Sequence, residues 1–178
     1  MKALPDHDEP LAGFSVQPVA FVVDEDPMTC SKVRNLASLM NLRCEAFASG
    51  KDFLDAFDRT ACGCLVTELR GTDLGGLQIQ QRLVEEGVLL PIIFVAANAS
   101  VPMAVRAMKR GAVYFFEKNS SNQVLLEQIQ AALQEDSERR SREEAGRVVR
   151  DRYQKLTARQ VEVLELVTAG LSRKEVGQ

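Results

Sequence analysis

The sequence predicts an α/β fold, in which a five-stranded parallel, doubly wound sheet is followed by a long helix and further helical segments. Two observations predict it. From Pro18 onward, short apolar runs alternate with longer segments whose apolar residues recur at helical spacing. This alternation is typical of parallel strands joined by crossover helices. The apolar runs are also rich in the β-branched and aromatic residues that central strands favour.

The apolar runs give the expected strands. They are Val19–Val23, Cys44–Phe47, Cys64–Thr67, Ile92–Ala96 and Val113–Phe116. Strands that are buried on both faces read as continuous apolar runs rather than as alternating ones, which favours a sheet covered by helices on both sides.

The helical segments between the strands have recognisable starts and ends. Asp26 can cap a first turn that Pro27 opens, and Ser49 with Asp52 resembles a capping box. Two later helices are expected over Leu77–Val84 and Val101–Met108, ended by Gly87 and Gly111.

The last helix of the sheet domain is expected to start near Ser120 or Ser121. Its apolar stripe consists of Leu126, Ile129 and Leu133. Residues 134–155 are dominated by Glu, Asp and Arg at spacings that support a solvated helix, and we interpret them as a charged helical linker. A coiled coil is the competing interpretation, but sustained apolar heptads are missing.

Composition limits the functional classes. The 178 residues are 46% hydrophobic and 26% charged, which is typical of a globular protein with a real core. The net charge of −3 excludes a chain-wide basic field for nucleic acid. The four cysteines, Cys30, Cys44, Cys62 and Cys64, lack zinc or redox spacing and are expected to be reduced, mostly buried thiols.

The N-terminal segment carries no secretion signal. Residues 1–17 contain acidic residues and prolines but no basic end and no apolar core, so we expect a flexible tail on a cytoplasmic protein. No apolar run approaches the roughly 20 residues that a membrane span needs.

Charged residues follow three of the expected strands. Asp24 and Glu25 end the first strand, Glu68 ends the third and Lys118 ends the fifth. Because loops at the carboxyl ends of parallel strands converge on one crevice, these side chains are expected to meet. Crowded carboxylates need a cation, which a divalent metal or the Lys118 ammonium can supply. Solvated charges at strand ends are the plainer alternative for any one of them.

The sequence here resembles response-regulator receiver domains of the FixJ-like branch, over roughly Pro18 to Leu133. The motifs that carry the resemblance lie at Val22–Pro27, Cys64–Arg70, Gly75–Leu77, Val101–Val113 and Phe115–Lys118. The resemblance implies a flavodoxin-like, CheY-like receiver fold. In that family an aspartate at the end of the third strand accepts a phosphoryl group, an acidic pair holds magnesium, and a lysine contacts the phosphoryl group. Asp24 and Glu25 match the acidic pair and Lys118 matches the lysine.

Three departures from the family pattern matter more than the matches. Glu68 stands at the phosphoacceptor position, Ala96 replaces the hydroxyl residue of the fourth strand, and Asn119 replaces the proline after the lysine. A glutamate carboxylate reaches on the order of 1 Å further than that of aspartate, so in-line attack geometry is lost. We therefore expect ordinary phosphoryl transfer to fail, and the first hypothesis is that Glu68 paired with Lys118 is a built-in phosphate mimic.

Ala96 counts against that hypothesis, because a methyl group cannot form the hydrogen bond of the lost hydroxyl. Phe115 matches the family's aromatic switch position, although we favour an ordinary core phenylalanine. A cis peptide after Lys118 is not expected, since Asn119 is not proline.

No cofactor is required by this interpretation. Asp24, Glu25 and Glu68 still offer oxygen ligands for a weak magnesium site, with which Lys118 competes.

The C-terminal residues predict two short helices. Thr157–Gln160 and Ser172–Glu175 are both helix-start signals. The amino-acid sequence of residues 156–178 resembles the N-terminal part of LuxR-type helix-turn-helix DNA-binding domains, the usual partners of FixJ-like receivers. The chain as given stops before a recognition helix, so it is not expected to bind DNA specifically. It is either part of a longer regulator, which we favour, or a natural remnant.

Our first functional interpretation is a transcriptional regulator, not an enzyme, whose receiver acts as a dimerisation or docking switch. Expected partners are a second copy through the receiver and linker, a histidine kinase or other protein, and DNA if the missing part is present. The alternative is a protein adaptor that uses Arg106, Lys109 and Arg110 and binds no DNA. A flavodoxin-like enzyme is disfavoured, because no glycine loop follows the first strand.

Overall fold

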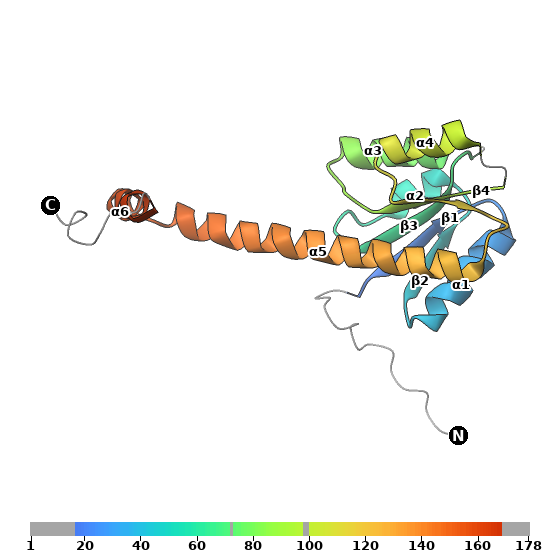
Figure 1. Cartoon of the computed structure of the whole chain (residues 1–178), viewed down its shortest axis with the longest axis horizontal. Coiled ribbons are helices and arrows are strands. Elements are labelled where there is room, and N and C mark those ends of the chain that lie inside the picture. The colour runs from blue at the N-terminus through green and yellow to red at the C-terminus, as the bar shows by residue number, and fades with distance from the viewer. Residues whose placement is uncertain (1–16, 72, 98–99, 169–178) are drawn as a thin grey trace, which may run out of the picture. The chain divides into compact units, whose positions relative to one another are not determined.

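A five-stranded parallel sheet lies at the centre of the N-terminal part of the protein, with strand order β2-β1-β3-β4-β5 (Figure 1). The computed structural model describes residues 17–71, 73–97 and 100–168. The strands are β1 (Val19–Val23), β2 (Arg43–Phe47), β3 (Gly63–Glu68), β4 (Ile92–Ala96) and β5 (Tyr114–Glu117). All four strand pairs are parallel. The expected doubly wound fold is confirmed, and each strand lies within one residue of its expected ends.

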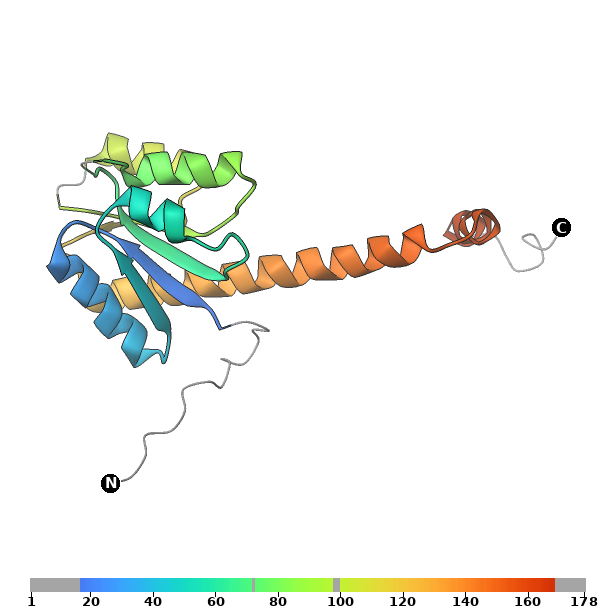
Figure 2. The same ribbon diagram turned by 180° about the vertical axis from the view of Figure 1, so that it is seen from behind.

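Helices cover both faces of the sheet, as Figures 1 and 2 show from opposite sides. One face packs against α1 (Pro27–Leu39) and the first part of α5 (Asn122–Gln154). The other packs against α2 (Gly50–Ala56), α3 (Gly76–Glu85) and α4 (Val101–Lys109). Each face has its own apolar cluster, which explains why the central strands read as unbroken apolar runs.

The expected helix caps are present. The Asp26 carboxylate accepts a hydrogen bond from the Met28 amide at 2.9 Å, just ahead of the α1 proline. The Ser49 hydroxyl accepts one from the Asp52 amide at 3.1 Å at the start of α2. Gly87 and Gly111 follow α3 and α4 with φ of 73° and 90°, a backbone conformation that glycine adopts without strain.

The apolar stripe of α5 differs from the expected one by one position. Leu125, Ile129, Ala132 and Leu133 are buried, whereas Leu126 is only half-buried. Asp136 is also fully buried, although it falls in the segment expected to be a solvated linker. Near its start, the segment expected to be a solvated linker therefore carries one carboxylate that the protein core encloses.

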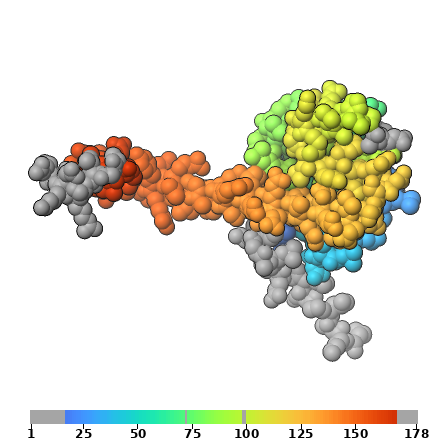
Figure 3. Space-filling model, viewed as in Figure 1, coloured from blue at the N-terminus to red at the C-terminus, as the bar shows by residue number. Residues whose placement is uncertain are grey.

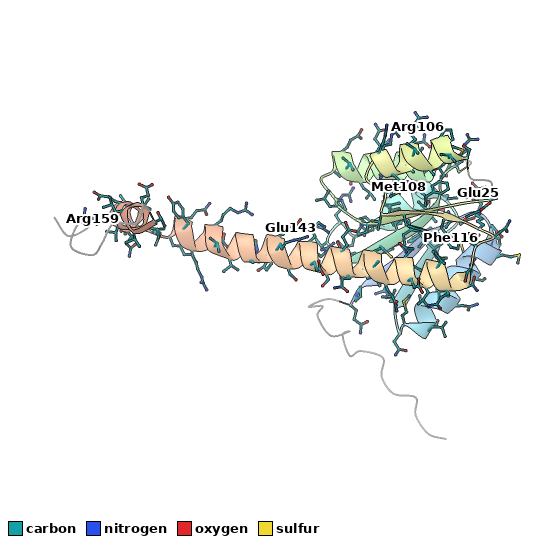
Figure 4. The ribbon with its side chains drawn as sticks, in the orientation of Figure 1. Glu25, Arg106, Met108, Phe116, Glu143 and Arg159 are labelled. Atoms are coloured by element: carbon teal, nitrogen blue, oxygen red, sulfur yellow. The ribbon has the colours of Figure 1, made fainter. Side chains whose placement is uncertain are left out.

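The chain divides into two compact units between Glu138 and Arg139. In the second unit the structure describes the remainder of α5 and α6 (Ala158–Thr168). Within α5, Arg139 pairs with Glu143 and Arg147 with Glu144, each at 2.9 Å, as suits a solvated helix; Figure 4 labels Glu143.

The helix start expected at Thr157 is present. The amide of Thr157 donates to the Gln160 side chain at 2.8 Å, while the amide of Gln160 donates back to the Thr157 hydroxyl at 3.4 Å. None of the residues of α6 is buried. The second helix expected from Ser172 lies outside the described residues. Across the described residues, each helix is either too short or too polar to span a lipid bilayer.

Candidate functional site

A pocket of about 280 Å³ opens at the carboxyl ends of β1 and β3. Charged side chains from three strand ends reach it, namely Asp24, Glu25, Glu68 and Lys118. The pocket is completed by the start of α2 and by the loop after β3. The parallel topology thus brings the four charged residues singled out by the sequence to one edge of the sheet.

The Lys118 ammonium lies between two carboxylates. Its Nζ donates a hydrogen bond to Asp24 Oδ1 at 3.1 Å and lies 2.9 Å from Asp24 Oδ2. It also forms an ion pair with Glu68 Oε2. The side chains of Lys118 and Asp24 are only 17% and 2% exposed, so water screens their attraction weakly.

Asp24 is the most buried acid of the site. Its Oδ1 also accepts a hydrogen bond from the Asp26 amide at 2.8 Å, which ties it to the cap of α1. Among the described residues, Oδ2 receives no hydrogen bond of acceptable geometry. The close ammonium of Lys118 is what compensates that oxygen, because a buried charge without a counter-charge is costly.

Burial and pairing act on Lys118 in opposite directions. Burial lowers the pKa of the ammonium, but hydrogen bonds to Asp24 and Glu68 and the charges of both acids outweigh it. The pKa of Lys118 therefore lies above its ordinary value of 10.5, and the side chain is a cation at neutral pH.

The weak magnesium site that the sequence allows stays a prediction, and the geometry shows how Lys118 competes for two of its acids. Among the described residues, no three His, Cys, Asp or Glu side chains come together in a way that could hold a metal ion. Asp24 and Glu68 both contact Lys118, while Glu25 is exposed at the pocket (Figure 4). The cation that balances the acids in this structure is the lysine.

Ala96 and Phe115 lie near the site without entering its charged centre. Ala96 is buried at the end of β4, and its carbonyl accepts a hydrogen bond from the Lys118 amide at 2.9 Å. Its methyl group offers no hydrogen bond. Phe115 is half-buried and packs against the apolar cluster under α2, α3 and α4, a position compatible with a core residue as well as with a switch.

Two further residues that shape the site were not predicted. Asp73 accepts hydrogen bonds from the amides of Leu74 and Lys51, which join the loop after β3 to the start of α2. Lys32 of α1 donates to the main-chain carbonyls of Lys118 and Ser120. Neither has a local signal, because an acid in a loop and a lysine on a helix are usually solvated.

Helix α4 lies at the surface of the space-filling view (Figure 3). It carries exposed apolar and cationic side chains, of which Figure 4 labels Met108 and Arg106. Val101, Val105 and Met108 are 77%, 45% and 44% exposed. The cationic residues singled out from the sequence, Arg106, Lys109 and Arg110, are exposed here as well.

Comparison with known proteins places these features in context. Residues 20–130 match the family model of the response regulator receiver domain. The chain is 35% identical to the response regulator protein TodT of Pseudomonas putida over 157 residues, which cover 88% of this chain and 69% of TodT. It is 37% identical to the transcriptional regulatory protein TdiR of Thauera aromatica over 158 residues, covering 89% and 70% of the two chains.

Solved structures agree with this likeness. The structure of the response regulator StyR superposes with a TM-score of 0.82 at 34% identity, over 90% of this chain and 81% of StyR. Full-length FixJ from B. japonicum superposes with a TM-score of 0.66 at 28% identity, over 91% and 80%.

Proposed function

Because this chain belongs to the response regulator receiver family, we propose that it is a transcriptional response regulator whose receiver is not phosphorylated in the ordinary way. In this proposal the receiver is a dimerisation or docking module for a DNA-binding part. Its role is regulatory rather than catalytic, and it acts in the cytoplasm. The relatives named as response regulators and transcriptional regulators support the class of function.

One observation carries the proposal: the Glu68 carboxylate contacts the Lys118 ammonium. Glu68 stands at the position where the family pattern has the phosphoacceptor aspartate. The ion pair places the negative charge of Glu68 beside the Lys118 ammonium, the group that contacts a phosphoryl group in the family pattern. The longer glutamate side chain thereby substitutes for phosphorylation in electrostatic terms.

Two further features support a site that does not accept a phosphoryl group. Lys118 engages both Glu68 and Asp24, so it competes with any metal ion that would neutralise an incoming phosphodonor. Ala96 offers no hydroxyl to bond a phosphoryl oxygen. The ion pairs of the unreacted site and the missing hydroxyl donor at Ala96 both raise the free-energy barrier to phosphoryl transfer.

The experiment is an intact-mass measurement after incubation with Mg²⁺ and acetyl phosphate. Wild type is compared with Glu68→Asp and with the double variant Glu68→Asp, Ala96→Thr, and the dimer fraction of each is measured by sedimentation velocity. We expect no phosphoryl gain for wild type and a partial gain for the double variant, since it regains both the shorter acid and the hydroxyl.

Glu68→Gln is the matched control, because it keeps the shape of the side chain and removes its charge. Its dimer fraction should differ from that of wild type if the carboxylate sets the state of the receiver. A wild-type mass gain that disappears in Glu68→Gln would overturn the proposal, since Glu68 itself would then be the acceptor.

A further inference from the structure

The ammonium of Lys32 contacts the loop between β5 and α5. Its Nζ donates hydrogen bonds to the carbonyl of Lys118 at 3.2 Å and to that of Ser120 at 3.4 Å. The same nitrogen lies 5.0 Å from the centre of the Phe116 ring, a cation–π distance; Figure 4 labels Phe116. Lys32 and Lys118 are 86 residues apart in sequence, so this contact joins α1 to the site through tertiary structure alone.

The environment of Lys32 is unusual for a lysine. The side chain is half-buried, and burial lowers the pKa of its ammonium. Among the residues that the structure describes, no carboxylate lies within ion-pair distance of it. Its partners among the described residues are two carbonyl groups and an aromatic face, and an ammonium that is partly removed from water needs such partners. A freely solvated surface lysine does not meet this description.

Two main-chain hydrogen bonds also hold the loop that Lys32 contacts. The Lys118 amide donates to Ala96 and the Ser120 amide donates to Glu117, so the amides of the loop are satisfied within and beside β5. The residue between them is Asn119, where the family pattern has a proline. Proline fixes its own φ and restricts the residue before it. Asparagine does neither, so the direction of the Lys118 main chain must be set by contacts.

We propose that Lys32 is a positioning residue, which holds the main chain of Lys118 and Ser120 and so directs the Lys118 side chain toward Asp24 and Glu68. Lys32 contacts the backbone of Lys118, and Lys118 contacts the acids. The inference rests on the proposed function, because it takes the contact between Lys118 and Glu68 as the feature that fixes the receiver.

The test measures the reactivity of each lysine amine toward limiting acetic anhydride, mapped by peptide mass, together with hydrogen exchange of residues 117–122. Lys32→Met removes the donor and keeps most of the side-chain volume, whereas Lys32→Arg keeps donors. Lys51→Met is the matched control, because Lys51 is an exposed lysine on α2. Exposed Lys109 serves as the internal reference in every sample.

In Lys32→Met we expect Lys118 to be acetylated several-fold faster and the amides of 117–122 to exchange roughly tenfold faster, as local opening becomes easier. Lys109 should react at its wild-type rate. Lys32→Arg and Lys51→Met should resemble wild type. A general loss of stability would instead raise the reactivity of all lysines together.

A folded Lys32→Met protein with wild-type Lys118 reactivity and wild-type exchange would overturn the inference. If that variant fails to fold, Lys32→Gln is measured in the same way and decides the question. Failure of the proposed function appears elsewhere, as a phosphoryl mass gain of wild type, so the two outcomes are distinguishable.

Discussion

The carboxylate of Asp136 accepts a hydrogen bond from the backbone amide of Gly63 at 3.0 Å, across 73 residues of sequence. Gly63 is the first residue of β3, and Glu68 is the last. The strand is therefore held at its start by α5 and at its end by Lys118. One short strand connects the candidate site to the place where the charged part of α5 begins.

Replacing Asp136 tests the first of these contacts. Asp136 is fully buried, so Asp136→Ala leaves the Gly63 amide without its acceptor. We expect the free energy of unfolding, measured with urea, to fall by about 2 kcal/mol, as for a lost hydrogen bond to a charged group. Asp136→Asn keeps an acceptor and should lose less. The control variant Glu135→Ala changes an exposed neighbouring position, and its free energy of unfolding should stay within about 0.5 kcal/mol of wild type. Equal losses of stability in Glu135→Ala and Asp136→Ala would contradict the role of Asp136 in anchoring the start of β3.

Gly63 itself cannot carry a side chain. Its φ is +146°, and a Cβ there would collide with the Val19 carbonyl oxygen in the adjacent strand. Gly63→Ala should therefore lower the free energy of unfolding by about 3 kcal/mol or more, since both backbone strain and a rigid clash are involved.

Gly146 offers the opposite case. It lies inside α5, and a Cβ there would meet nothing within 4 Å. Gly146→Ala should raise helicity by circular dichroism and stabilise the helix by up to about 1 kcal/mol. For the earlier variant, a Gly63→Ala protein that melts at the wild-type temperature would show that the geometry described at the start of β3 is wrong.

The difference between what the sequence predicted and what it missed has a physical cause. The strands and the gathering of Asp24, Glu68 and Lys118 follow from local patterns and from parallel topology, so they could be predicted. Lys32 and Asp136 act through contacts across 86 and 73 residues, for which no local pattern exists. How Asp24 and Glu68 share the Lys118 ammonium depends on tertiary geometry, which spacing in the sequence does not determine.

The raised pKa of Lys118 predicts a loss of stability at alkaline pH. The folded-state pKa lies above the ordinary value of 10.5, so the folded protein holds this proton more tightly than the unfolded chain does. The resulting stabilisation is fully present below 10.5 and is lost as the pH rises through the folded-state pKa. Urea unfolding of wild type and Lys118→Met from pH 8 upward should show a constant difference at first and a shrinking one above pH 10.5.

Groups other than Lys118 also titrate in that range, but they are common to both proteins and cancel in the difference. Glu68→Gln removes one of the two acids that raise the pKa and should reduce the pH-dependent part. A difference between wild type and Lys118→Met that grows with pH has the wrong sign for a stabilised ammonium and would contradict the ion pairs.

The cysteines should be poor nucleophiles in the folded protein. None of the four forms a disulfide; Cys30, Cys62 and Cys64 are buried, and Cys44 is half-buried. Burial is the main cause that raises the pKa of Cys44 from 9.0 to about 11 and that of Cys64 to about 12. At pH 8 a thiol of pKa about 11 is roughly a hundredfold less ionised than one of pKa 9.0, and the thiolate is the reacting species.

With an aromatic disulfide reagent, native protein should show one slow reaction at Cys44, and denatured protein four fast ones. Cys44→Ser should abolish the slow native reaction; if that reaction persists unchanged, another thiol is accessible and the packing of α1 and β2 differs from the one described.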